Sequence, residues 1–203
     1  MKERTENKIK LVLLVLLLLT VSVIIIYNAV SLVLQTVYPR SYSEEISRNA
    51  EIYDLDEALL YALIETESGF DKNAVSSVGA KGLTQITPET FQWLQTKTGE
   101  SYEDDALFEP VVSVKYGAFF LRYLLDEFGD TKTALAAYHA GRGRVNEWLS
   151  DPRYSSDGKK LDVIPYNDTD FYAEKVLKVR ERYCNIYDLE NKSLTEDKEN
   201  GNS

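Results

Sequence analysis

The sequence predicts a protein of the mainly α class, in which one transmembrane helix precedes a helical domain with at most short strands. Two observations support this prediction. A continuous apolar stretch occupies residues 11–34 of the 203-residue chain, and apolar residues after it recur at helical spacing between capping and stop signals. Short strands are expected only around residues 82–87.

The apolar stretch over residues 11–34 is long enough to cross a membrane. About 20 apolar residues span a hydrocarbon core of ~30 Å, so this segment fits as a tilted helix. Four basic residues precede it and only Arg40 follows closely, which predicts a cytoplasmic N-terminus over residues 1–10 and an extracytoplasmic remainder. A cleaved signal peptide is the alternative, but its apolar region normally has about 7–15 residues. We therefore expect a retained anchor at the cell membrane.

Charge and composition exclude several classes of partner and cofactor. Residues 41–203 carry 18 basic and 31 acidic side chains, a balance that repels phosphates and argues against nucleic acid binding. The single cysteine, Cys184, permits no intrachain disulfide, and one cysteine with one histidine forms no usual zinc cluster. We expect no metal or other cofactor. No Gly-x-Ser-x-Gly motif accompanies His139, which favours a structural or substrate-contacting role for this histidine over a general base.

The exported part of the chain begins with a linker over residues 35–42 and continues as a helical domain over residues 43–187. Capping-box spacing at residues 41–44 and 54–57 predicts two helices, over about 43–53 and 56–67. The glycine- and serine-containing segment from residue 69 to residue 82 is predicted to be an irregular loop.

Proline and glycine delimit the next helices. Thr87 followed by Pro88 predicts a capped helix start, and Pro110 opens a longer helix for which Gly129 supplies the stop. Thr131 is positioned to cap the alanine-rich helix that follows.

The last part of the domain alternates short elements and loops. A short helix is predicted over residues 145–149, a polar loop over 151–168 and a final helix over about 170–187. Residues 188–203 are polar, contain no aromatic side chain and are predicted to form a disordered acidic tail.

Glu67 is the side chain with the clearest chemical potential. Helical spacing places it at the end of an apolar stripe that contains Leu60, Leu63 and Ile64, whereas Glu65 falls on the polar side. Desolvation favours the neutral carboxyl and raises its pKa, so that it can donate a proton near neutral pH. Such an acid can protonate the leaving oxygen of a glycoside. From this pattern alone, a solvated glutamate at a helix end remains the competing interpretation.

Four ordered segments resemble the signature of the soluble lytic transglycosylase catalytic domain, which has a goose-type-lysozyme-like fold. They are Glu67-Ser68-Gly69-Phe70, residues 76–88 (Ser-Ser-Val-Gly-Ala-Lys-Gly-Leu-Thr-Gln-Ile-Thr-Pro), Ala137-Tyr138-His139-Ala140-Gly141, and Ile164 to Thr169 with Tyr172 after it. The resemblance covers about residues 53–187 and implies a lysozyme-like helical domain.

The resemblance also implies roles for individual residues. Glu67 is the single catalytic acid and base, and Tyr138 helps to orient its carboxyl group or the departing oxygen. The implied substrate-binding residues are Ser76, Gly82, Gln85, Tyr138, His139 and Tyr166. Gly79 and Gly82 are expected to keep the loop backbone close to the sugar. The chain departs from the family pattern at Thr84 and Thr87, where methionine is usual, and at His139, where asparagine is usual. We expect these departures to affect fine contacts with the sugar and not the acid.

The implied activity is peptidoglycan cleavage. The family's reaction breaks the bond between N-acetylmuramic acid (MurNAc) and N-acetylglucosamine (GlcNAc) and forms 1,6-anhydro-MurNAc ends without consuming water. Peptidoglycan glycan strands and the membrane are the expected partners, and the sequence identifies no protein partner. Two alternatives stay open at this stage: a muramidase, which is a lysozyme-type hydrolase, and a non-catalytic glycan-binding scaffold of an envelope assembly.

Overall fold

The computed structural model describes residues 2–189, so the predicted tail over 188–203 lies almost wholly outside the described residues. The chain divides into two compact units, residues 1–40 and residues 41–203. The helices are, in order, α1 (Lys2–Val37), α2 (Ser43–Ile52), α3 (Glu57–Ser68), α4 (Pro88–Thr98), the 3₁₀ helix η1 (Asp104–Phe108), α5 (Pro110–Phe128), α6 (Thr131–Ala140), α7 (Arg142–Leu149) and α8 (Asn167–Tyr187).

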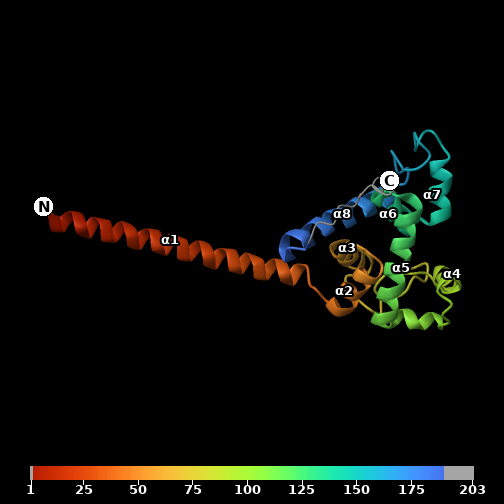
Figure 1. Cartoon of the computed structure of the whole chain (residues 1–203), viewed down its shortest axis with the longest axis horizontal. Coiled ribbons are helices and arrows are strands. Elements are labelled where there is room, and N and C mark those ends of the chain that lie inside the picture. The colour runs from red at the N-terminus through yellow and green to blue at the C-terminus, as the bar shows by residue number, and fades with distance from the viewer. Residues whose placement is uncertain (1, 190–203) are drawn as a thin grey trace, which may run out of the picture. The chain divides into compact units, whose positions relative to one another are not determined.

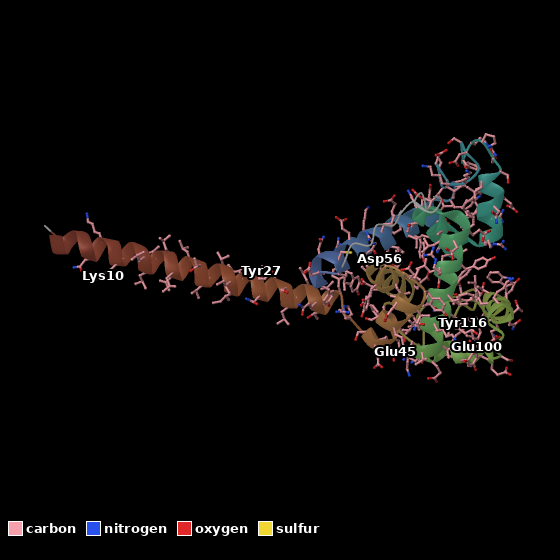
Figure 2. The ribbon with its side chains drawn as sticks, in the orientation of Figure 1. Lys10, Tyr27, Glu45, Asp56, Glu100 and Tyr116 are labelled. Atoms are coloured by element: carbon pink, nitrogen blue, oxygen red, sulfur yellow. The ribbon has the colours of Figure 1, made fainter. Side chains whose placement is uncertain are left out.

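The first unit consists mainly of α1 (Figure 1). Within it, residues 13–37 form one helical segment long and apolar enough to span a membrane. Figure 2 shows the side chains of Lys10 and Tyr27 standing out from this helix. At its C-terminal end the helix extends three residues beyond the predicted anchor, and there the Thr36 hydroxyl donates to the Leu32 carbonyl at 2.9 Å.

The second unit is built around α3, whose residues 58–64 are fully buried. Helix α3 packs on α8, α8 packs on α6, and α5 contacts both α6 and α2 (Figure 1). The mainly α prediction is confirmed. Residues 2–189 contain no strand longer than an isolated bridge, and those bridges join Val75 to Lys81 and Lys81 to Ile86.

The predicted capping boxes of α2 and α3 are wrong. Helix α2 begins after Tyr42 without a side-chain cap, and Asp54 adopts a left-handed backbone conformation that delays the start of α3. Asp56 is the cap: its carboxylate accepts a hydrogen bond from the Leu59 amide at 2.8 Å and contacts the Arg180 guanidinium at 2.5 Å. This buried pair joins the start of α3 to α8.

Gly82 is required for the close approach of the loop before α4 to the chain around η1. It has a φ of 73°, and a Cβ atom there would lie 1.9 Å from the Leu107 carbonyl oxygen. Since Gly82 is buried against this segment, its need for glycine comes from internal packing. The expected closeness of this glycine to a sugar stays a prediction.

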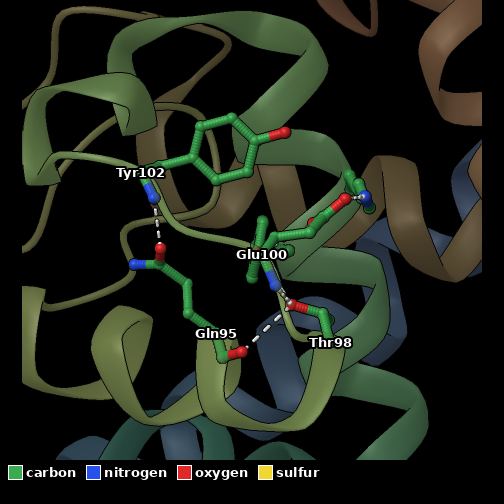
Figure 3. Close-up of polar contacts among 6 residues, drawn as sticks. Gln95, Thr98, Glu100 and Tyr102 are labelled. Atoms are coloured by element: carbon green, nitrogen blue, oxygen red, sulfur yellow. Dashed lines mark hydrogen bonds and ion pairs between the residues drawn. The ribbon is translucent and has the colours of Figure 1, made fainter.

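Helix α4 begins as predicted, with the Thr87 hydroxyl accepting from the Thr90 amide at 3.2 Å. The segment after it is held by side chains (Figure 3). The Gln95 amide oxygen accepts from the Tyr102 backbone amide at 2.5 Å, and Glu100 pairs with Lys115 of α5 at 2.5 Å. These contacts position η1, which the sequence did not predict.

Helix α5 starts and stops at the predicted residues, with Gly129 in the left-handed region after it. The cap of α6 is Asp130 instead of Thr131, because the Asp130 carboxylate accepts from the Thr133 amide at 2.8 Å. Helices α7 and α8 each begin three residues earlier than predicted.

Candidate active site

Glu67 lies in the last turn of α3, where the helix meets the loop that leads to α4. Gly69 ends the helix with a φ of 59°. The neighbouring Ser68 hydroxyl donates to the Leu83 carbonyl at 2.9 Å and so ties the end of α3 to that loop. The position of the carboxyl is therefore fixed from two sides, by the buried body of α3 and by the loop.

Tyr172 of α8 is the residue that contacts Glu67. Its phenol donates a hydrogen bond to the Glu67 carboxylate, with 2.5 Å between the Tyr172 hydroxyl oxygen and Glu67 Oε1. Burial, together with the negative charge of Glu67, raises the pKa of Tyr172 well above its ordinary value, so the phenol keeps its proton and remains a donor. Sequence reasoning assigned this orienting role to Tyr138, although Tyr172 was already part of the fourth motif.

The acidity of Glu67 matches that of a proton donor at neutral pH. Burial raises the pKa of its carboxyl from 4.5 to about 7, and the hydrogen bond from Tyr172 and the charge of Lys175 only partly oppose this shift. Glu65 was predicted to fall on the polar side of the helix. It is only partly exposed, burial raises its pKa, and it forms a hydrogen bond with Tyr183.

Tyr138, in the last turn of α6, contacts the same loop. Its hydroxyl donates to the Thr84 carbonyl at 2.8 Å. Thr84 is itself fully buried, and its hydroxyl bonds to the Ser113 carbonyl at 2.9 Å. Gly117 makes room for it, because a Cβ atom there would lie 2.3 Å from the Thr84 side chain. The threonine that replaces the family's usual methionine is thus a buried anchor, and the expected effect on sugar contacts does not arise from its side chain.

His139 lies directly beside the Tyr172 phenol. The two rings stack with centroids 4.3 Å apart and an interplanar angle of 22°. The His139 side chain is 36% exposed, and its Nε2 atom is 4.0 Å from the Asp168 carboxylate. Burial lowers the pKa of the imidazole below its ordinary value, and the charge of Asp168 opposes this shift. Glu67, Tyr172 and His139 therefore form one continuous group.

Ser76 and Gln85 brace the loop between α3 and α4. The Ser76 hydroxyl accepts from the Ala80 amide at 3.0 Å. The Gln85 side chain donates to the carbonyls of Ala74 and Gly82 at 3.1 and 2.9 Å. Both predicted sugar-binding side chains therefore form hydrogen bonds with the loop backbone. These bonds help to fix the shape of the loop between α3 and α4.

Tyr166 is the last predicted substrate-binding residue. It immediately precedes α8 and packs against Trp148 of α7, with ring centroids 4.9 Å apart and an interplanar angle of 73°. Its side chain is 46% exposed. The ring is thus anchored on α7 and retains a solvent-facing surface. Within residues 2–189, no group of three or more His, Cys, Asp or Glu side chains is arranged to hold a metal ion.

Comparison with known proteins relates this arrangement to one family. Residues 44–161 match the transglycosylase SLT domain. The soluble lytic murein transglycosylase of Salmonella typhimurium is 30% identical over 152 residues, which cover 71% of this chain and 23% of that protein. The membrane-bound lytic murein transglycosylase C of Haemophilus ducreyi is 27% identical over 173 residues, covering 74% and 47%.

Solved structures agree with the sequence relatives. The lytic transglycosylase Slt of Pseudomonas aeruginosa superposes with a TM-score of 0.68 at 31% identity, covering 77% of this chain and 26% of that one. The 70 kDa soluble lytic transglycosylase of Escherichia coli gives a TM-score of 0.66 at 25% identity, covering 76% and 26%. The chain spans about a quarter of the length of these soluble relatives.

Proposed function

Because the chain belongs to the transglycosylase SLT family, we propose that it is a peptidoglycan lytic transglycosylase that cleaves the MurNAc–GlcNAc bond and leaves 1,6-anhydro-MurNAc ends. The observation that carries this proposal is the state of Glu67. It is a desolvated carboxyl with a pKa of about 7, held by one phenol donor. Such a group is suited to give up a proton and to take one back at neutral pH.

The proposed reaction uses Glu67 twice. The protonated carboxyl first donates its proton to the glycosidic oxygen, while the N-acetyl group of MurNAc assists at the anomeric carbon. The resulting carboxylate then accepts the proton of the MurNAc 6-hydroxyl as that oxygen attacks the anomeric carbon. The hydrogen bond from Tyr172 stabilises the carboxylate between these two steps. One carboxyl suffices because the groups that attack the anomeric carbon, the N-acetyl group and the 6-hydroxyl, both belong to the substrate.

We also propose that α1 anchors the protein in the membrane with the catalytic domain on the extracytoplasmic side. The candidate span over residues 13–37 supports the anchor. The excess of basic residues before it supports the orientation. Since residues 41–203 are strongly acidic, we expect tethering and specific glycan contacts, instead of general charge attraction, to bring the domain to the wall.

Digestion of purified peptidoglycan with Glu67→Gln tests the catalytic assignment. We expect this variant to bind glycan strands and to lose nearly all cleavage, because the glutamine amide is far too weak an acid to protonate the glycosidic oxygen. Glu65→Gln is the matched control. It removes another carboxyl of the same helix, one that forms a hydrogen bond with Tyr183, and it should retain cleavage. Mass spectrometry of the wild-type products should show 1,6-anhydro ends. Unchanged cleavage by Glu67→Gln would contradict the assignment of the acid.

A further inference from the structure

His139 lies near Glu67 and can accept a proton on its imidazole ring. Its imidazole stacks on the same phenol that donates to the acid, with the ring centroids 4.3 Å apart and the phenol oxygen 2.5 Å from Glu67 Oε1. One phenol therefore lies between the imidazole and the acid. Inverting glycosidases hold the acid and the base of the reaction roughly 6.5–9.5 Å apart, which leaves room for a water molecule.

We propose that His139 is a general base for water, so that the site also hydrolyses a fraction of the glycosidic bonds that it cleaves. This inference rests on the proposed function, because it assigns a second outcome to the same cleavage. The asparagine that the family resemblance leads one to expect at this position has no basic nitrogen. The hydrolytic outcome is thus a property of this chain's histidine.

The step conserves atoms and charge. Glu67 donates its proton to the glycosidic oxygen, and the bond from that oxygen to the MurNAc anomeric carbon breaks. A water oxygen bonds to the anomeric carbon in place of the 6-hydroxyl, and the water proton passes to an imidazole nitrogen of His139. The imidazolium then returns a proton to the Glu67 carboxylate through solvent. One water is consumed, and the product is a reducing MurNAc end.

The surroundings of the imidazole suit this role. With 36% of its side chain exposed, His139 is open to water, and burial of the remainder lowers its pKa, which leaves the ring neutral at neutral pH. Asp168 stands 4.0 Å from Nε2, where its charge can stabilise the imidazolium as it forms. The sequence alone favoured a structural or substrate-contacting role, because it did not show the carboxylate or the acid beside the ring.

The rates of the two competing attacks indicate that both anhydro ends and reducing ends should be detectable. Well-oriented intramolecular attack has effective molarities of roughly 10⁵ M and above, so the 6-hydroxyl outcompetes unassisted bulk water by at least about a thousandfold. A positioned general base accelerates a step by about 10²–10⁴-fold. The upper end of this acceleration reaches only the lower end of the advantage of the 6-hydroxyl, for which Glu67 also serves as the base, so reducing ends should be a minor share of the products beside anhydro ends.

The test counts newly formed ends. Purified peptidoglycan is first reduced with borohydride, then digested with the full chain in detergent, and finally reduced with borodeuteride, so that only new reducing ends carry deuterium. We expect wild-type digests to contain both anhydro ends and deuterated ends. His139→Phe retains a ring for stacking on Tyr172 but has no base, and it should lower the deuterated share of all new ends at least about tenfold.

His139→Gln is the second variant, and circular dichroism establishes that each variant is folded. Because the readout is a ratio of products, a change in total rate does not affect it. The role of His139 would be overturned if the wild-type digest contained anhydro ends alone. It would also be overturned if the folded variants kept the same deuterated share as the wild type. Absence of any cleavage by the wild type would instead refute the proposed function itself.

Discussion

Replacement of Glu67 by glutamine should stabilise the protein at alkaline pH while it removes activity. The folded carboxyl has a pKa of about 7, compared with 4.5 for an ordinary glutamate. Between these values the folded protein holds a proton that the unfolded chain has released, so wild-type stability falls as the pH rises through this range. The difference corresponds to about 3 kcal/mol at 1.36 kcal/mol per pKa unit. Glutamine does not titrate and avoids this loss.

The assay is chemical unfolding of the full chain in detergent between pH 4.5 and pH 8, followed by the fluorescence of Trp93 and Trp148, which both lie in residues 41–203. The free energy of unfolding of Glu67→Gln relative to wild type should rise by about 3 kcal/mol across this range. For a domain of this size, that equals a rise in relative melting temperature of about 6–12 °C. Glu181→Gln, an exposed change on α8, should show no such rise. Parallel pH curves for wild type and Glu67→Gln would refute the desolvation argument.

Three further changes and one control test the residues that support the site. Tyr172→Phe removes a hydrogen bond that lowers the pKa of Glu67, so the alkaline limb of the kcat/KM profile should move to higher pH. Asp56→Ala removes both the α3 cap and the carboxylate of a buried ion pair, and should lower the free energy of unfolding by about 3–5 kcal/mol in denaturant titrations. Gly82→Ala should unfold the loop or the whole domain, because its Cβ atom would lie 1.9 Å from a backbone oxygen. Gly79→Ala, where the space is open, should cost only about 1 kcal/mol in the same titration.

Helix boundaries were predictable wherever the backbone of a single residue determines them. Pro88 and Pro110 open their helices and Gly129 closes one, because their allowed conformations are intrinsic. The cap of α3 was not predictable in this way. Asp54 and Asp56 are both acceptable caps locally, and the choice depends on Arg180, which lies 124 residues further along the chain. A tertiary ion pair therefore decides where that helix begins.

The same distinction applies to the site. Glu67 was identifiable because an apolar stripe on its own helix predicts its desolvation. Its contact with Tyr172 joins residues 105 positions apart and depends on how α8 lies against α3, which no local pattern reveals. Thr84 was read as a change in sugar contacts, but its burial against Ser113 and Gly117 depends equally on the packing of the loop on α5.

The way in which Glu67 is made a weak acid links catalysis to the core of the domain. With a pKa of 4.5, only about one carboxyl in 300 would be protonated at pH 7, and proton donation would carry an added cost of about 3 kcal/mol. A cation in direct contact would impose this cost, because it lowers the pKa. The contact is instead a phenol that keeps its proton, and the charge of Lys175 is the smallest of the three contributions. Desolvation dominates, and α3, which bears Glu67, packs on α8, which bears Tyr172. Burial in this part of the domain thus also keeps a share of the Glu67 carboxyl protonated at neutral pH.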